Sequence, residues 1–200
     1  MANQTITKCL IGEARMNFVK VFTPEEFDNG EKKYQVLLSF PKTDKKLLQT
    51  VQNAIEECRR KAEQTMFHGR LPKNFNLPNI KDGDEDYEEG KGFPGEWVIK
   101  ASSSFKPEVV KKAVVMGKTQ LVPITDEDEF YSGCYGYASV VFFAYDSQKS
   151  KGISCGLNSL LKSKDGERFG GSRENVDEAF AGVLGGIDTL DDLPGDDDIF

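Results

Sequence analysis

The sequence predicts a mainly β protein, built as a small closed or partly open antiparallel barrel with one main helix. Three observations support this fold class: short runs of alternating apolar and polar residues, turn signals between these runs, and a single segment with helical periodicity. Strands do not alternate regularly with helices, which argues against a doubly wound parallel sheet. With 200 residues, of which 38% are hydrophobic, the chain is long enough for one domain with a substantial core.

The first strands come before residue 42. Residues 6–22 mix β-branched and aromatic residues and predict one long strand or two short ones. A turn at Asp28-Asn29-Gly30 separates them from a strand over residues 34–40. In that strand alternate residues form a buried face and a polar outer face that includes Ser39. The residues of the buried face are Tyr34, Val36, Leu38 and Phe40.

Pro41 ends this strand, and a helix follows it. Thr43 or Asp44 can cap the helix, which we expect to extend to about Met66. Its apolar positions recur at a spacing of 3.6 residues, which predicts one buried face. They are Leu47, Val51, Ile55, Cys58 and Ala62.

The second half of the chain contains the remaining strands. Residues 67–94 hold prolines, glycines and acidic residues, so they predict a long, solvated excursion. A strand over residues 97–105 and a hairpin around Gly117 are expected next. Residues 134–145 are apolar on both faces and predict a central strand, whereas residues 153–161 fit a strand or a short helix.

Charge is distributed unevenly along the chain. The net charge is −7, but nine acidic residues and no basic residue follow Arg173. The preceding part contains 26 basic and 24 acidic residues and therefore carries +2. We expect a domain over residues 1–173 that binds a polyanion, and an acidic tail over residues 174–200. The tail should hold a short helix near residues 174–183 and be disordered beyond Gly185-Gly186.

The sequence lacks the motifs of nucleophilic catalysis, phosphate binding and calcium binding. The only histidine, His68, stands without a nucleophile motif, and no phosphate-binding glycine loop is present. The run from Asp82 to Asp86 imitates a calcium loop but has Tyr87 and Phe93 where glycine and glutamate are required. We expect no catalysis, no metal ion and no cofactor. The four cysteines, which we expect to be reduced and mostly buried, are Cys9, Cys58, Cys134 and Cys155.

Aromatic and basic residues occur next to one another along the body of the chain. Sequence-tolerant binding of single-stranded nucleic acid combines aromatic faces, which stack on bases, with cations, which hold phosphates. We expect Phe18, Phe40, Phe142 and Phe143 to lie mostly in the core. The candidates for stacking are Trp97, Tyr131, Tyr135 and Tyr137. The candidates for phosphate binding are Arg15, Lys20, Lys33, Lys42, Lys100 and Lys106.

The last residues, Asp196-Asp197-Asp198-Ile199-Phe200, resemble the acidic tip of bacterial single-stranded DNA-binding proteins. Further segments resemble a family of phage-encoded single-stranded DNA-binding proteins. These segments are residues 34–42, 99–103, 131–135, 143–146, 151–154 and 165–171. The resemblance implies an OB-fold-type barrel that coats single-stranded DNA in replication or recombination. It also implies that the tip from Asp196 to Phe200 docks replication and recombination enzymes.

Two other functions stay open at this stage. One is a metal-dependent nuclease that uses the carboxylates from Asp82 to Glu89, and the other is an acidic DNA mimic or structural phage protein. No run approaches the roughly 18 apolar residues of a membrane span, and no secretion signal opens the chain, so we expect a protein of the host cytoplasm. The sequence leaves open whether it forms a homodimer.

Overall fold

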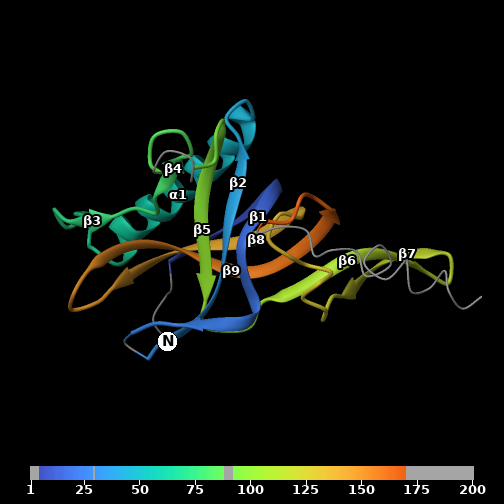
Figure 1. Cartoon of the computed structure of the whole chain (residues 1–200). Coiled ribbons are helices and arrows are strands. Elements are labelled where there is room, and N and C mark those ends of the chain that lie inside the picture. Colours follow the sequence, from blue (N-terminus) through green and yellow to red (C-terminus); the bar gives the residue numbers. More distant parts are fainter. Residues whose placement is uncertain (1–4, 29, 88–91, 170–200) are drawn as a thin grey trace, which may run out of the picture. The chain divides into compact units, whose positions relative to one another are not determined.

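The structure is a computed structural model that describes residues 5–28, 30–87 and 92–169. Figure 1 shows one barrel of strands with a helix beside it. The chain divides into two units, Met1–Arg168 and Phe169–Phe200, and the barrel belongs to the first. In chain order the elements are β1 Ile6–Glu26, β2 Lys32–Pro41, α1 Lys45–Thr65, β3 Phe75–Asn76, β4 Ile80–Asp82, β5 Glu96–Ser103, β6 Glu108–Val115, β7 Lys118–Pro123, β8 Tyr135–Asp146 and β9 Lys151–Lys164.

Five of these strands close the barrel. β1 pairs with β2 and β8, β2 pairs with β5, and β8 pairs with β9, all antiparallel. The ring closes where β5 and β9 meet in a parallel contact between Ser102 and Gly156. This five-stranded barrel confirms the predicted OB-type fold. The long strand β1 pairs with two neighbours: its first part pairs with β8 and its second part with β2.

The core lies inside the ring and under α1. Met16, Leu38, Phe40 and Phe142 are fully buried, and all four cysteines are free and buried. The helix follows its prediction closely, since the Asp44 carboxylate accepts a hydrogen bond from the Leu47 N–H at 2.9 Å. The side chains that α1 buries include every predicted apolar position.

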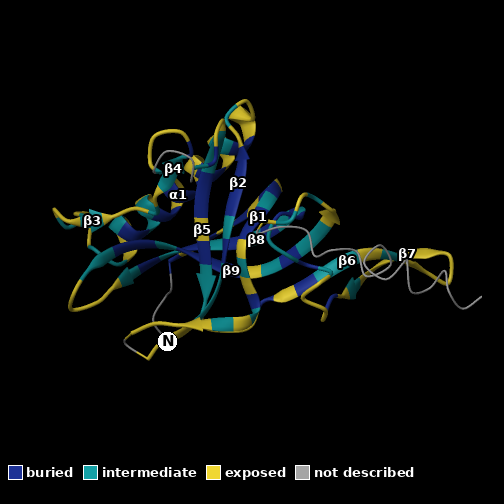
Figure 2. Ribbon diagram, viewed as in Figure 1, coloured by how far each residue is buried: buried dark blue, intermediate teal, exposed yellow. Residues whose placement is uncertain are grey.

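Several strands lie outside the ring. β6 pairs with β9 and continues into β7, and these two strands form the predicted hairpin around Gly117. Met116 and Gly117 both have positive φ (50° and 73°), as a two-residue type I′ turn requires. The ends of this hairpin are largely exposed (Figure 2). Residues 151–164 are a strand, which settles the alternative that the sequence left open.

The structure corrects four expectations about packing. The excursion over residues 67–94 is partly packed, because it contains β3 and β4, which pair with β9 and β5. Phe18 is 65% exposed, and Phe143 is half-buried on the outward face of β8. Ser39 is buried rather than exposed, since the Asn17 side-chain amide donates a hydrogen bond to its Oγ at 2.8 Å. The expected features of residues 174–200 lie outside the described residues.

Candidate nucleic-acid interface

The strands β1, β2 and β5 place basic and polar side chains in rows on the outward face of the barrel. Leu37 pairs with Lys100, and Gln35 pairs with both Lys20 and Ser102. Paired residues point to the same side of a sheet, so Lys20 and Lys100 share one face. We call this face, defined by these five residues, the outer wall. Both of its lysines are exposed.

Two hollows lie next to one another in the outer wall. The first, of about 260 Å³, is lined by Phe18 and Lys20 among others. The second, of about 350 Å³, is lined by residues that include Tyr87. Leu37 and Lys100 line both hollows. We call these two adjacent hollows the wall groove.

Two aromatic rings, Phe18 and Tyr87, line the wall groove, and the buried Phe93 packs against both. The β1–β2 register shifts at Phe18, whose backbone has φ 47°, and the side chain leaves the barrel interior there. The Phe18 ring meets Phe93 edge-to-face at 6.5 Å between centroids, and Phe93 meets Tyr87 at 5.1 Å. The Lys81 Nζ lies 5.0 Å from the Tyr87 ring centroid. We call Phe18, Tyr87 and Phe93 the aromatic cluster.

Within the part of the chain that the structure describes, the lysines of the wall groove lack the carboxylate partners that several other basic residues have. Among the described residues, Lys20, Lys81 and Lys100 form no ion pair with a carboxylate. The Lys33 Nζ, by contrast, lies 2.8 Å from a Glu31 carboxylate oxygen. An unpaired, exposed ammonium binds a phosphate without first giving up a carboxylate. The wall groove is therefore suited to a chain of phosphates.

Lys42 and Trp97 form a separate site at the end of β2. The Lys42 Nζ forms an ion pair with Asp82 and another, of 2.7 Å, with Asp84, and it lies 5.1 Å from the Trp97 ring centroid. The hydrogen bonds to Asp82 and then Asp84 raise the pKa of Lys42. Trp97 pairs with Phe40 across the strands, so its ring is on the inward side, against the core. The structure thus does not place these two predicted residues on the outer wall.

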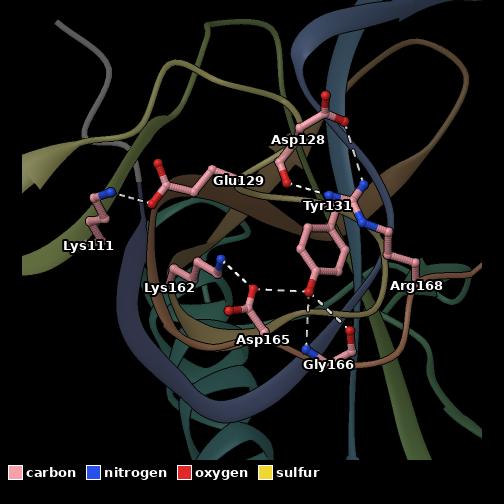
Figure 3. Close-up of polar contacts among 8 residues, drawn as sticks. All are labelled: Lys111, Asp128, Glu129, Tyr131, Lys162, Asp165, Gly166 and Arg168. Atoms are coloured by element: carbon pink, nitrogen blue, oxygen red, sulfur yellow. Dashed lines mark hydrogen bonds and ion pairs between the residues drawn. The ribbon is translucent and has the colours of Figure 1, made fainter. Parts of the chain in front are cut away.

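Tyr131 is bound within a polar network that Figure 3 shows. Its hydroxyl lies 3.0 Å from both Asp165 Oδ1 and the Gly166 carbonyl oxygen, and the Arg168 guanidinium lies 3.9 Å from its ring centroid. Lys162 donates to the same Asp165 oxygen at 2.7 Å. We call these five residues the Tyr131 network. One face of the Tyr131 ring is already covered by Arg168, which leaves less of it for a base.

Arg15 and Tyr135 meet beside this network. The Arg15 guanidinium donates to the Glu167 carbonyl oxygen at 3.0 Å and lies 6.0 Å from the Tyr135 ring centroid. The Lys164 Nζ lies 4.8 Å from the same ring. Lys164 also forms an ion pair of 2.6 Å with Glu13, and this hydrogen bond is the main reason that the pKa of Glu13 is lowered.

The other predicted residues are scattered. The Lys106 Nζ lies 5.8 Å from the Phe22 ring centroid. The Tyr137 ring lies against Gly12, where an added Cβ would be 2.2 Å from the ring, so Gly12 gives the ring its space. The partner-binding residues from Asp196 to Phe200 lie outside the described part of the chain.

Sequence reasoning missed Lys81 and the aromatic cluster. Phe18 was assigned to the core because it falls in a strand-like run, and only the register shift turns it outward. Lys81, Tyr87 and Phe93 belong to the segment expected to be solvated. The one available signal was the aromatic residues within that acidic block, which a purely solvated loop does not need.

The described carboxylates of that block do not form a metal site. Within residues 5–28, 30–87 and 92–169, no group of three His, Cys, Asp or Glu side chains could hold a metal ion. Asp82 and Asp84 both bind a lysine, which lowers the pKa of each carboxyl. No helix in the described residues is long and apolar enough to cross a membrane.

An OB-type barrel with an open groove of lysines and aromatic rings defines a class of oligonucleotide-binding proteins. The family model of the Enterobacter phage Enc34 ssDNA-binding protein matches residues 7–192. This chain belongs to that family.

Solved structures and a curated relative agree with this membership. The single-stranded DNA-binding protein from bacteriophage Enc34 in complex with ssDNA has a TM-score of 0.63 and 25% identity, over 85% of this chain and 95% of that one. A C-terminal truncation of the same protein has a TM-score of 0.62 and 26% identity, over 82% and 88%. Putative protein p50 of Acyrthosiphon pisum secondary endosymbiont phage 1 is 28% identical over 179 residues, 86% of this chain and 91% of the relative.

Proposed function

We propose that this protein binds single-stranded DNA along the wall groove and coats it during phage replication or recombination. The observation that carries the proposal is the pair of adjacent hollows in which three lysines, without a carboxylate partner among the described residues, stand beside the aromatic cluster. Lysines hold the phosphates, while the exposed Phe18 supplies a stacking face. A solved relative is a complex with ssDNA, which supports the same ligand here.

A titration of the full chain by filter binding tests this function. Single-stranded and duplex oligonucleotides are compared at several salt concentrations, with and without Mg²⁺. We expect tight binding of the single strand, a linear fall of log K with log salt, and no cleavage. Preference for the duplex or an absent salt dependence would contradict the proposal, and magnesium-dependent cleavage would favour the nuclease alternative.

We further propose that the acidic tip, Asp196 to Phe200, docks replication or recombination enzymes in the host cytoplasm. The Ile199 and Phe200 side chains offer an apolar anchor beside aspartates, which suits a basic-rimmed apolar pocket. Phe200→Ala should abolish docking to a purified partner and leave the affinity for DNA unchanged. Truncation after Arg173 should abolish docking as well, and equal docking by all three chains would refute this role. Sedimentation of the same chains without DNA tests the homodimer.

A further inference from the structure

A third hollow continues the wall groove across the place where the barrel closes. It has a volume of about 470 Å³, larger than either hollow of the wall groove. Ser102 and Ser154 line both this hollow and the second hollow of the wall groove. They belong to β5 and β9, the two strands whose parallel contact closes the ring. We call this third hollow the seam groove.

Aromatic side chains flank the seam groove. Phe105 is 83% exposed directly after β5, and its N–H donates a hydrogen bond to Ser103 Oγ at 3.0 Å, which fixes the turn that presents the ring. Phe143 lies across β9 at Gly156, where an added Cβ would be 3.2 Å from the ring and 2.9 Å from Val141. The glycine therefore lets the Phe143 ring lie close over the neighbouring strand.

The polar lining favours a nucleic acid over a basic or purely apolar partner. Serine residues 102, 103, 104 and 154 contribute hydroxyl groups, Lys33 lines one side, and the lining contains no acidic residue. Lys33 is paired with Glu31, but the next residue after Phe105 is the exposed Lys106. Exposed aromatic faces, on which bases stack, and nearby cations, which hold phosphates, are the components of single-strand recognition.

From this continuity we infer that the seam groove is a second base-stacking subsite, in which Phe105 stacks on nucleotides that extend beyond the wall groove. The inference rests on the proposed function, since the seam groove would bind a further stretch of the DNA strand that the wall groove binds. It predicts that Phe105 contributes only when the oligonucleotide is long enough to reach from the wall groove to the seam groove.

The test compares oligothymidylates of increasing length against the full chain, with fluorescence anisotropy as the readout. For Phe105→Ala we expect unchanged affinity for the shortest oligonucleotide that binds and a loss of roughly 5- to 150-fold for long ones, as one stacked base predicts. Phe18→Ala should lose affinity at every length, because Phe18 lines the wall groove. Met116→Ala, which removes a side chain that is 98% exposed at the hairpin tip, is the matched control and should lose none.

A tryptophan at the same position gives an independent readout. Phe105→Trp should keep the affinity for long oligonucleotides, and its fluorescence should be quenched by long but not by the shortest ones. Equal losses of Phe105→Ala at all lengths, or no loss at any length, would overturn the inference while the proposed function stands. A change in the sedimentation of DNA-free Phe105→Ala would instead show that the seam groove binds a second protein chain. Failure of the wild-type chain to bind any oligonucleotide would overturn the proposed function and this inference together.

Discussion

The Tyr131 network and the wall groove contain the same kinds of residues, aromatic rings beside lysines or arginines, but these residues differ in their contacts. In the network, the Tyr131 hydroxyl, Asp165 and Lys162 bind one another, and the Arg168 guanidinium covers the ring. In the wall groove, Phe18 is 65% exposed, and Lys100 forms no ion pair among the described residues. Side chains that already bind one another stabilise the fold, whereas side chains without such contacts are available to a ligand.

This difference explains why adjacency in the sequence is a poor guide to the site. Several of the predicted phosphate ligands and stacking residues have partners of their own, among them Lys33, Lys42, Tyr131 and Tyr135. Two others, Lys20 and Lys100, stand in the wall groove. Replacing single side chains of the Tyr131 network and of the wall groove tests this comparison.

The largest effect is expected from the network. Tyr131→Ala removes a half-buried ring that packs against the core and leaves the Gly166 N–H without the Tyr131 oxygen it donates to at 3.3 Å. We expect the free energy of unfolding to fall by about 2–3 kcal/mol. DNA affinity, measured well below the unfolding temperature, should stay the same. Tyr131→Phe is the control and should cost only about 1 kcal/mol in denaturant unfolding. A loss of affinity without a loss of stability would assign Tyr131 to the interface.

Phe18→Ala should give the opposite pattern. The ring is mostly exposed, so its removal should change the free energy of unfolding little. Because the ring supplies a stacking face, binding of single-stranded DNA should weaken by about 1–3 kcal/mol. Isothermal titration and thermal unfolding of the same sample measure both quantities. Lower stability with unchanged binding would show that Phe18 packs in the core, as the sequence predicted, and does not stack on a base.

Single lysines offer a finer comparison. Lys100→Gln should reduce the slope of log K against log salt by about 0.7, the value for one phosphate contact with a single strand. Lys162→Gln is matched to it in charge, but the Lys162 ammonium binds Asp165, and its side chain is 12% exposed. This second variant should therefore leave the slope unchanged. Equal slopes for Lys100→Gln and the wild-type chain would show that Lys100 does not contact a phosphate of the DNA.

The fold could be predicted from the sequence because its elements follow local periodicity. The helix from Lys45 to Thr65 and the β6–β7 hairpin depend on residues a few positions apart. Phe18 could not be placed, since a register shift between β1 and β2 decides its direction. The role of Tyr131 depends on Asp165, which lies 34 residues away in the sequence. Composition likewise gives the number of lysines but not which of them have acidic partners.

The smallest expected effect concerns the charge of Asp165. The hydrogen bond from Lys162, and then the one from Tyr131, lowers the pKa of the Asp165 carboxyl from its usual value of 3.8. A carboxyl whose pKa is lower in the folded state than in the unfolded state stabilises the fold above the unfolded pKa. That contribution is lost as the pH falls through the folded pKa. The wild-type chain should therefore be more stable than Asp165→Asn at neutral pH.

The difference should begin to shrink as the pH falls below the unfolded pKa of about 3.9. It should disappear once the pH passes the lower folded pKa, where the wild-type carboxyl takes up its proton and matches the neutral amide. Urea unfolding of both chains between pH 3 and pH 7 measures this change. Because Asp165 is exposed, the difference should also decrease with added salt. A difference that is independent of pH would mean that the shape of the side chain, rather than its charge, holds Lys162 and Tyr131 together. In that case Lys162 would be less firmly bound to the network, and the contrast with Lys100 on the outer wall would be weaker.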